Sequence, residues 1–142
     1  MRKELIAISV LMLGAATVQA GAHGAIAIGG NTADVAKNGI AVGDSYNYST
    51  KGEAETRALQ ECLTPGSAPA ETKALCKIVA DFSNEWVSIA MDPESGTPGF
   101  GWSIDANKAT ADRNALAQCR ASSPDERKQY CVISRSDHDE KP

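Results

Sequence analysis

The sequence contains few of the residues from which catalytic and metal sites are commonly built. Only two histidines occur, His23 and His138, and the four cysteines include no C-x-x-C pair. His23 lies near the start of the chain and His138 near its end, so we do not expect a histidine-based catalytic triad. The cysteine spacing likewise does not indicate a zinc site, which is typically built from closely spaced cysteines.

Basic residues are too few to indicate a nucleic acid or an anionic membrane as the partner. Asp and Glu outnumber Lys and Arg by 18 to 14, and the formal net charge is −4. Binding to phosphate-rich surfaces depends on clusters of Lys and Arg, and we find none after residue 20. The glycines near the start of the chain do not follow the G-x-G-x-x-G pattern of a nucleotide-binding loop, so no cofactor is expected.

Residues 1–20 have the features of a secretory signal peptide. Arg2 and Lys3 precede a short apolar run, residues 5–13, and small residues lead to a cleavage point after Ala20. The run is shorter than the roughly 20 residues that a membrane-spanning helix needs, although an uncleaved N-terminal anchor is the alternative. We therefore predict an exported protein, periplasmic or secreted, with no membrane span in its mature chain. Removal of residues 1–20, which carry a net +1, would lower the net charge from −4 to −5.

One segment of the chain occurs twice. Residues 51–62, KGEAETRALQEC, return as residues 108–119, KATADRNALAQC, and in both copies a second cysteine follows. Cysteines of an exported protein usually form disulfides, and four cysteines allow three pairings. Equivalent residues should pair equivalently, so the repeat favours Cys62–Cys76 and Cys119–Cys131. In the chain-entropy model each bridge would stabilise the fold by roughly 3 kcal/mol.

Strand and turn signals surround both copies in the same order. The strands are expected at residues 25–28, 40–48 and 76–80 in the first copy and at 88–91, 100–104 and 131–134 in the second. The sequence therefore predicts an α+β fold made of a duplicated strand-strand-helix-strand unit, stapled by disulfides. We expect a mostly antiparallel sheet with both helices on one face. The domain would span residues 21–135, with repeats at about 24–82 and 86–135, and residues 136–142 would form a polar tail.

Both predicted helices have recognisable beginnings and narrow apolar faces. Thr50 and Glu53 have the spacing of a capping box, and Asn107 is a suitable N-cap for the second helix. The residues that share one face are small: Ala54, Ala58 and Cys62 in the first helix, and Ala111, Ala115 and Cys119 in the second. Each helix can therefore lie close against a sheet.

An ordered series of motifs resembles a known family. The motifs are GAIAI at 24–28, SYNYST at 45–50, CKIV at 76–79 with FSN at 82–84, SIA at 88–90, GFGW at 99–102 and ALAQC at 115–119. This series resembles the bacterial exported family called domain of unknown function 4189, over nearly the whole mature chain. Family members often carry a further cysteine shortly after the FSN step, where this chain has Glu85 and Trp86, and residues 32–37 are an insertion in the first hairpin. The resemblance implies no activity. Some exported proteins of this general kind, encoded beside secreted antibacterial toxins, are similar to periplasmic inhibitors that protect the producer.

Paired carboxylates are the remaining candidates for catalysis. Two of them held about 5–9 Å apart in one pocket would suit glycoside hydrolysis, and the candidates are Asp44, Asp92, Glu94 and Asp105. The Gly-x-Ser steps at 43–45 and 101–103 lack the second glycine of a nucleophile elbow. We assign no catalytic residue and no metal ligand. Enzyme activity stays open, and a non-enzymatic role is favoured.

Five of the seven aromatic residues lie on or beside predicted strands. These candidate binding residues are Tyr46, Tyr48, Trp86, Phe100 and Trp102. They either fill the core or form an exposed recognition face, because Trp and Tyr dominate interface hot spots. Strand alternation predicts that Tyr46 and Tyr48 share one face, and that Phe100 and Trp102 do likewise.

One main hypothesis follows from three features of the sequence: its small size, its net negative charge and the absence of a recognisable set of catalytic residues. The protein would be an exported non-enzymatic binding module with a protein partner, namely a toxin or an envelope protein. In its specific form it would be an inhibitor or immunity protein for a secreted antibacterial toxin. Two alternatives remain: a small cell-envelope enzyme that uses paired carboxylates, and a secreted effector or structural envelope component.

Overall fold

The computed structural model describes residues 21–31, 34–64, 66 and 68–140, so the predicted signal peptide lies outside the described residues. The elements are β1 (His23–Gly29), α1 (Val35–Asn38), β2 (Ala41–Tyr48), α2 (Lys51–Leu63), α3 (Ala70–Lys73), β3 (Lys77–Phe82), β4 (Trp86–Met91), β5 (Phe100–Asp105), α4 (Lys108–Ser122), the 3-10 turn η2 (Lys128–Tyr130) and β6 (Val132–His138). The strand-strand-helix-strand unit therefore occurs twice, as predicted, once as β1-β2-α2-β3 and once as β4-β5-α4-β6.

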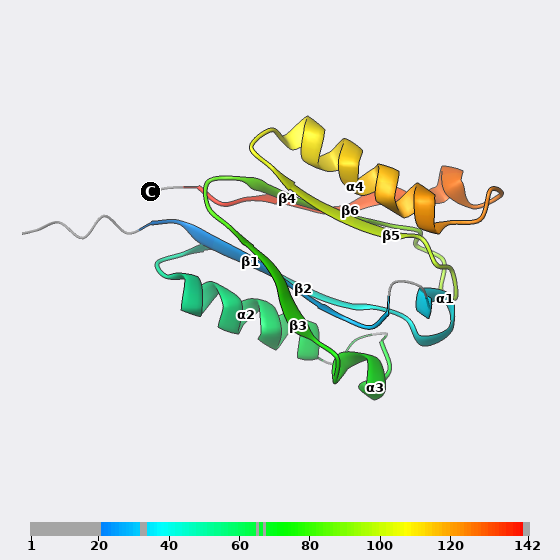
Figure 1. Cartoon of the computed structure of the whole chain (residues 1–142), viewed down its shortest axis with the longest axis horizontal. Helices are drawn as coiled ribbons and strands as arrows, with labels where there is room; N and C mark the ends of the chain where they lie inside the picture. Colours follow the sequence, from blue (N-terminus) through cyan, green and yellow to red (C-terminus); the bar gives the residue numbers. More distant parts are fainter. Residues whose placement is uncertain (1–20, 32–33, 65, 67, 141–142) are drawn as a thin grey trace, which may run out of the picture.

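The described strands form two antiparallel sheets. Their strand orders are β2-β1-β3 and β5-β4-β6. The sheets pack face to face, with α2 on the outer side of the first and α4 on the outer side of the second (Figure 1). The α+β class and the antiparallel pairing are confirmed. The expectation of one sheet with both helices on one face is wrong. Each unit forms its own three-stranded sheet, and the helix of that unit covers the outer face of the sheet.

Strand alternation divides the apolar residues between two kinds of interface. On β1, Ile26 and Ile28 point to the facing sheet, whereas Ala25 and Ala27 point to α2. The inter-sheet core consists of Ile26, Ile28, Phe82, Val87, Ile89 and Phe100. Large side chains thus separate the two sheets, and small ones lie beneath the helices.

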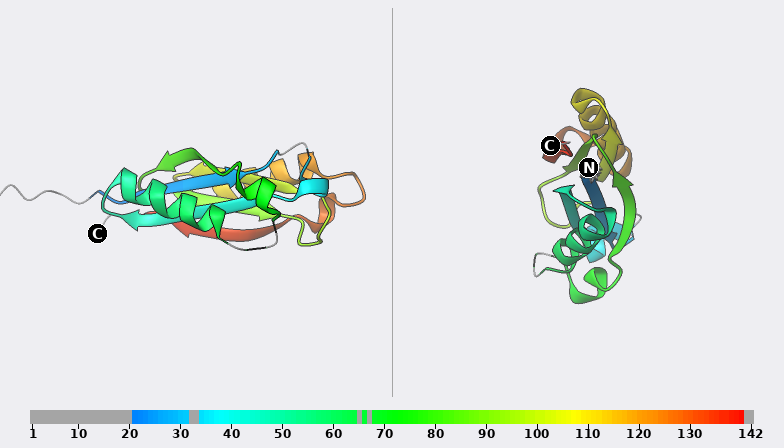
Figure 2. Two further views of the ribbon diagram at one scale, coloured as in Figure 1. Left: turned by 90° about the horizontal axis from the view of Figure 1, so that it is seen from below. Right: turned by 90° about the vertical axis from the view of Figure 1, so that its left-hand side faces the viewer.

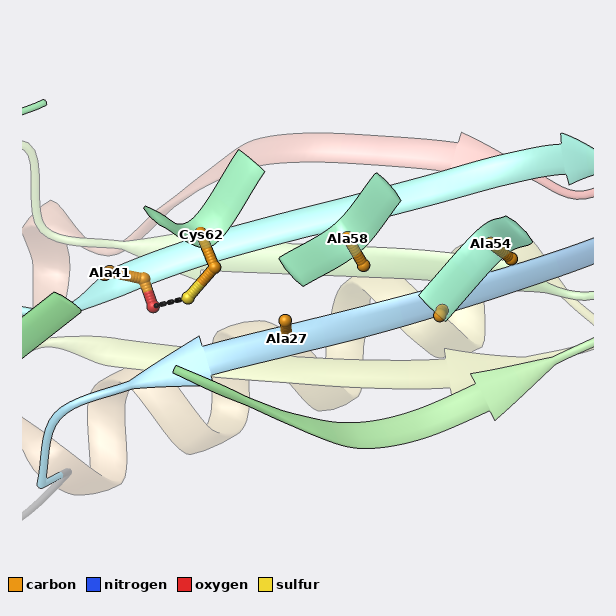
Figure 3. Close-up of a cluster of buried hydrophobic side chains, with 6 residues drawn as sticks. Ala27, Ala41, Ala54, Ala58 and Cys62 are labelled. Carbon is orange, nitrogen blue, oxygen red and sulfur yellow. Dashed lines mark hydrogen bonds between the residues drawn. The ribbon is translucent and has the colours of Figure 1, made fainter. Parts of the chain in front are cut away.

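Each helix lies very close to its sheet because glycine occupies the contact point. A Cβ atom added to Gly43 would lie 2.1 Å from the backbone oxygen of Ala58, and one added to Gly101 would lie 2.4 Å from that of Ala115. Figure 3 shows the small side chains of α2 above β1 and β2. The same contact in both units supports their duplication, and it explains why the helix faces consist of alanine and cysteine.

The predicted disulfides and helix caps are confirmed. Cys62 is bonded to Cys76 and Cys119 to Cys131, so each bridge ties the end of a helix to the start of the third strand of its unit. Thr50 and Glu53 form the capping box of α2. The Asn107 side chain accepts a hydrogen bond from the Thr110 amide at the start of α4.

The predicted polar tail is wrong for residues 136–140. Strand β6 continues to His138 and pairs with β4 over its whole length. Asp139 is fully buried, and its carboxylate accepts hydrogen bonds from the amides of Asn47, at 2.7 Å, and Asn84, at 3.1 Å. These bonds fasten the C-terminal segment to turns of the first unit. Among the described residues no helix has the length and apolar character needed to cross a membrane.

Candidate functional site

The two long edges of the sandwich differ in chemistry. Strands β3 and β5 lie along one edge and β2 and β6 along the other (Figure 2). The β3/β5 edge contributes Phe82, Trp102 and Ile104 to the inter-sheet core. The other edge carries charged residues, and we call it the charged seam: Asp44 and Tyr46 of β2, Glu61 of α2, and Arg135 and Asp137 of β6.

Because the two units are duplicates, the residues at the two edges can be compared position by position. Asp44 directly follows Gly43, the glycine beneath α2, and Trp102 directly follows Gly101, the glycine beneath α4. In the same way Asp137 lies six residues after Cys131, as Phe82 does after Cys76. Positions that are apolar at one edge are therefore charged at the other.

An arginine at the surface is held by a buried carboxylate at the centre of the charged seam. Arg135 donates a hydrogen bond to Asp44, and its guanidinium lies 3.7 Å from the carboxylate of Glu61. The Asp44 side chain is 1% exposed, whereas that of Arg135 is 45% exposed. Asp44 therefore fixes the position of Arg135 and leaves much of the guanidinium open to a partner.

Burial gives Asp44 unusual acid–base properties. Removal from water raises the pKa of its carboxyl from the ordinary 3.8 to about 6. Arg135 opposes this shift in pKa, whereas the negative charges of Asp137 and Glu61 add to it. Asp44 thus takes up a proton in the range where most carboxyl groups have already lost theirs.

Tyr46 extends the charged seam to the surface. It is 42% exposed, and the charge of Asp137 raises the pKa of its hydroxyl, so Tyr46 remains a neutral donor. The expectation that Tyr46 and Tyr48 share a face is wrong. Asn47 has φ 62 and sits at a shift of the β1–β2 register, which turns Tyr48 toward α2.

The other predicted binding residues do not join Tyr46. Phe100 is buried in the inter-sheet core, and Trp102 packs against that core from the same face, as strand alternation predicted. Trp86 stacks on His138 with ring centroids 4.7 Å apart, and the Lys108 ammonium lies 5.6 Å from its ring centre. The five aromatics therefore form no single recognition face.

A cavity adjoins the charged seam where the C-terminal end of α2 and the start of β2 meet Met91 and Arg135 of the second unit. It has a volume of about 250 Å³, and Glu61, Lys73 and Arg135 supply its charged wall. Val42 and Met91 form part of its apolar wall. A partner side chain that approached Arg135 could enter this space, because the same arginine borders both.

The four candidate carboxylates are distributed over three places. Asp92 and Glu94 line a second cavity of about 280 Å³, but both bind Arg127, at 2.7 and 2.6 Å. Hydrogen bonds from Arg127 lower the pKa of Asp92, whereas a glycosidase needs one carboxyl that holds its proton. Asp105 accepts a hydrogen bond from the Asn107 amide in the turn before α4, and Asp44 lies in the charged seam.

Other polar clusters have structural roles. The buried Ser88 hydroxyl donates to Asp112 at 2.6 Å and lies 3.1 Å from the Ser136 hydroxyl, beneath α4. The Ser45 hydroxyl donates to the backbone oxygen of Ala54. Among the described residues no group of three or more His, Cys, Asp or Glu side chains could hold a metal ion.

Sequence reasoning missed Arg135, Asp137 and Glu61. Arg135 and Asp137 lie on either side of the predicted boundary between domain and tail, and Glu61 belongs to no motif that indicates a site. Continued alternation beyond Cys131 could have extended the third strand, but it could not have revealed that β6 faces β2.

The comparisons with known proteins agree with the resemblance noted from the motifs. No curated protein and no solved structure was found to match the chain. The model of the family described as "domain of unknown function (DUF4189)" matches residues 23–137. The chain therefore belongs to the DUF4189 family.

Proposed function

We propose that this protein is an exported, non-enzymatic binding module that recognises a protein partner through the charged seam. The observation that carries the proposal is that an exposed Tyr46 and a half-exposed Arg135 lie on the same seam, Arg135 against the buried Asp44 and Tyr46 beside the partly buried Asp137. Tyrosine and arginine are enriched among interface hot spots. Because Asp44 holds Arg135 in place, the side chain loses less conformational freedom when a partner binds.

The rigidity of the scaffold supports the same reading. Two disulfides close the helix ends, and buried hydrogen bonds from Asn47 and Asn84 to Asp139 fasten the end of the chain. Pre-organised surfaces of this kind are typical of tight inhibitors. We accordingly propose an inhibitor or immunity protein for a secreted toxin as the specific role. The two disulfides support export to an oxidising compartment.

One observation favours a second candidate function. The pKa of Asp44 is raised to about 6, by burial and in part by the charge of Asp137, and a carboxyl group with such a pKa is suited to acid–base catalysis. A small envelope enzyme would use this pair rather than Asp92 and Glu94. The near-complete burial of Asp44 and its contact with Arg135 weigh against direct attack on a substrate.

A capture experiment tests the binding function. The exported, oxidised protein would be used to isolate partners from envelope and secreted fractions, with identification by mass spectrometry. Tyr46→Ala is the informative variant, and Tyr130→Ala is its control, because Tyr130 is 47% exposed and lies outside the charged seam. Trp102→Ala is less suitable, since Trp102 packs against the core.

A stoichiometric protein recovered with the wild type and with Tyr130→Ala, but not with Tyr46→Ala, is the expected result. Equal recovery of the partner with all three proteins would show that the charged seam is not the binding surface. Hydrolysis of an envelope glycan that is lost in Asp137→Asn would instead support the enzyme.

A further inference from the structure

We propose that the partner inserts an acidic side chain, from glutamate or aspartate, into the cavity that Lys73 and Arg135 line beside the charged seam. This inference rests on the proposed binding function and adds the chemistry of the partner. Three observations carry it: an unpaired lysine in the cavity wall, the open donors of Arg135, and a neutral hollow at the equivalent place in the second unit.

Lys73 is a charged residue of the cavity wall that has no partner of its own. It is partly buried, yet among the described residues its ammonium makes no ion pair and no hydrogen bond. Its backbone is fixed from both sides. The Thr72 hydroxyl donates to the backbone oxygen of Asn38 at 2.5 Å, and the amide of the disulfide-bonded Cys76 donates to that of Lys73 at 3.0 Å. An ammonium placed at a cavity in this way can bind an anionic group without first giving up another.

The second unit shows that a lysine at this place can be paired within the chain. Lys73 and Lys128 each lie three residues before the second cysteine of their unit. Lys128 is bonded to Asp125 at 2.6 Å, whereas the residue of the first unit that corresponds to Asp125 is Ala70. The first unit therefore keeps available a charge that the second unit neutralises.

Arg135 supplies a second cation at the same cavity. A guanidinium carries several N–H donors, and within the described part of the chain Arg135 donates one hydrogen bond, to Asp44, and keeps 45% of its side chain exposed. Glu61 is the carboxylate among the residues that line the cavity, and Arg57 binds it at 2.7 Å. Asp44 and Glu61 thus each have an arginine, and Lys73 is left for an added carboxylate.

The rest of the cavity suits the aliphatic part of an acidic side chain. Ile40, Val42 and Met91 line it and are only partly buried. With a volume of about 250 Å³, the cavity has room for a single side chain. Methylene groups can lie against these apolar residues while the carboxylate meets Lys73 or Arg135.

The equivalent hollow of the second unit is neutral. Gln118 directly precedes Cys119, as Glu61 directly precedes Cys62. Gln118 and Phe100 belong to the lining of this hollow, which has a volume of about 370 Å³ and no charged lining residue. The cationic wall is therefore a property of the cavity beside the seam, and the second hollow is an internal control.

Negative charges outside the cavity do not prevent this contact. The chain has a formal net charge of −4, and Asp137 lies two residues after Arg135 on β6 without lining the cavity. Exposed charges are screened over about 8 Å at physiological salt, whereas a partly buried pair is screened much less. Long-range repulsion thus slows the approach of an acidic partner and leaves the local pairing intact.

A titration with a short acidic peptide tests the inference. The probe is acetyl-Gly-Glu-Gly-Glu-Gly-amide, and its control carries glutamine in place of glutamate, which keeps the shape without the charge. Binding to the isotope-labelled oxidised protein would be followed by NMR at pH 7.5. Lys73→Gln is the test variant, and Lys128→Gln is its control, because Lys128 has the equivalent position and is already paired with Asp125.

The expected result is a set of shifts at Lys73, Met91 and Arg135, with none at Gln118. Lys73→Gln should weaken binding about two- to fivefold, as expected for a partly exposed ion pair, and Lys128→Gln should not. Equal binding of the glutamine peptide, shifts at both hollows, or equal weakening by the two variants would each overturn the inference. Tighter binding of the same peptide with phosphoserine in place of glutamate would also overturn it, in favour of a phosphate group. Loss of partner capture in Tyr46→Ala combined with no peptide binding would retain the binding function and remove only the acidic side chain.

Discussion

Replacement of Asp44 by asparagine should make the protein more stable at neutral pH. Asparagine has the shape of a protonated carboxyl, and its side-chain oxygen can still accept the hydrogen bond from Arg135. The substitution therefore removes only the cost of ionising a buried group. Wild-type protein bears that cost because the pKa of Asp44 is raised from 3.8 to about 6.

The sign and size follow from proton linkage. Between pH 3.8 and about 6 the folded state binds more protons at Asp44 than the unfolded state does, so stability falls as the pH rises through this window. The contribution of protonated Asp44 is complete below 3.8 and lost above 6. A shift of about two units corresponds to about 3 kcal/mol. We expect Asp44→Asn to raise the free energy of unfolding by up to about 3 kcal/mol at pH 7.5 and to have almost no effect near pH 3.5.

Urea unfolding with intact disulfides, followed by circular dichroism across this pH range, measures the effect. Asp81→Asn is the control, because its exposed pairing with Lys51 should contribute less than about 1 kcal/mol. A variant less stable than wild type at pH 7.5 would refute the reasoning. It would mean that the ion pair with Arg135 outweighs the cost of burial.

The remaining predictions concern packing and the C-terminal segment. Gly43→Ala should lower the free energy of unfolding by about 1–3 kcal/mol or more, because its Cβ would lie 2.1 Å from the backbone of α2. Gly52→Ala on the exposed side of α2 meets no atom within 4 Å and should instead raise it by about 0.5–1 kcal/mol, and equal effects in urea unfolding would contradict the close helix–sheet contact. Asp139→Ala should cost about 2–4 kcal/mol and speed hydrogen exchange at the amides of Asn47 and Asn84, whereas unchanged exchange would show that the C-terminal segment does not hold these turns.

Local features of the fold could be predicted from the sequence because their determinants are close together in the chain. The capping box of α2 needs only Thr50 and Glu53, and the disulfide pairing follows from the spacing of the two repeats. The stacking of the two sheets could not be predicted in this way. Strand patterns show which faces are apolar, but they do not show whether the strands of the second unit extend the first sheet or pack against it.

The charged seam could not be predicted from the sequence for the same reason. Asp44 and Arg135 are 91 residues apart, and each alone has the sequence context of a solvated residue. Tyr46 was identified by its residue type, but its relation to Tyr48 was mispredicted because a single residue, Asn47, adopts a positive φ and changes the strand alternation. Such irregularities depend on tertiary contacts, here the bond from the Asn47 amide to Asp139.

The proposed binding role of the charged seam has a cost in stability. The equivalent edge of the sandwich is closed by Phe82 and Trp102, which bury apolar surface without ionisation. The charged seam retains a buried acid whose ionised form destabilises the fold. We expect Asp44→Asn to be more stable and to bind the proposed partner more weakly, because a neutral amide holds Arg135 less firmly than a carboxylate does.

The most direct test of the account is the affinity of the captured partner for the charged seam, measured by isothermal titration calorimetry with wild-type protein, Tyr46→Ala and Tyr130→Ala. The account predicts that Tyr46→Ala weakens binding by at least about 2 kcal/mol, or roughly thirtyfold, whereas Tyr130→Ala binds like the wild type. Equal affinities for all three proteins would show that the partner binds elsewhere, and the assignment of function to the charged seam would fall.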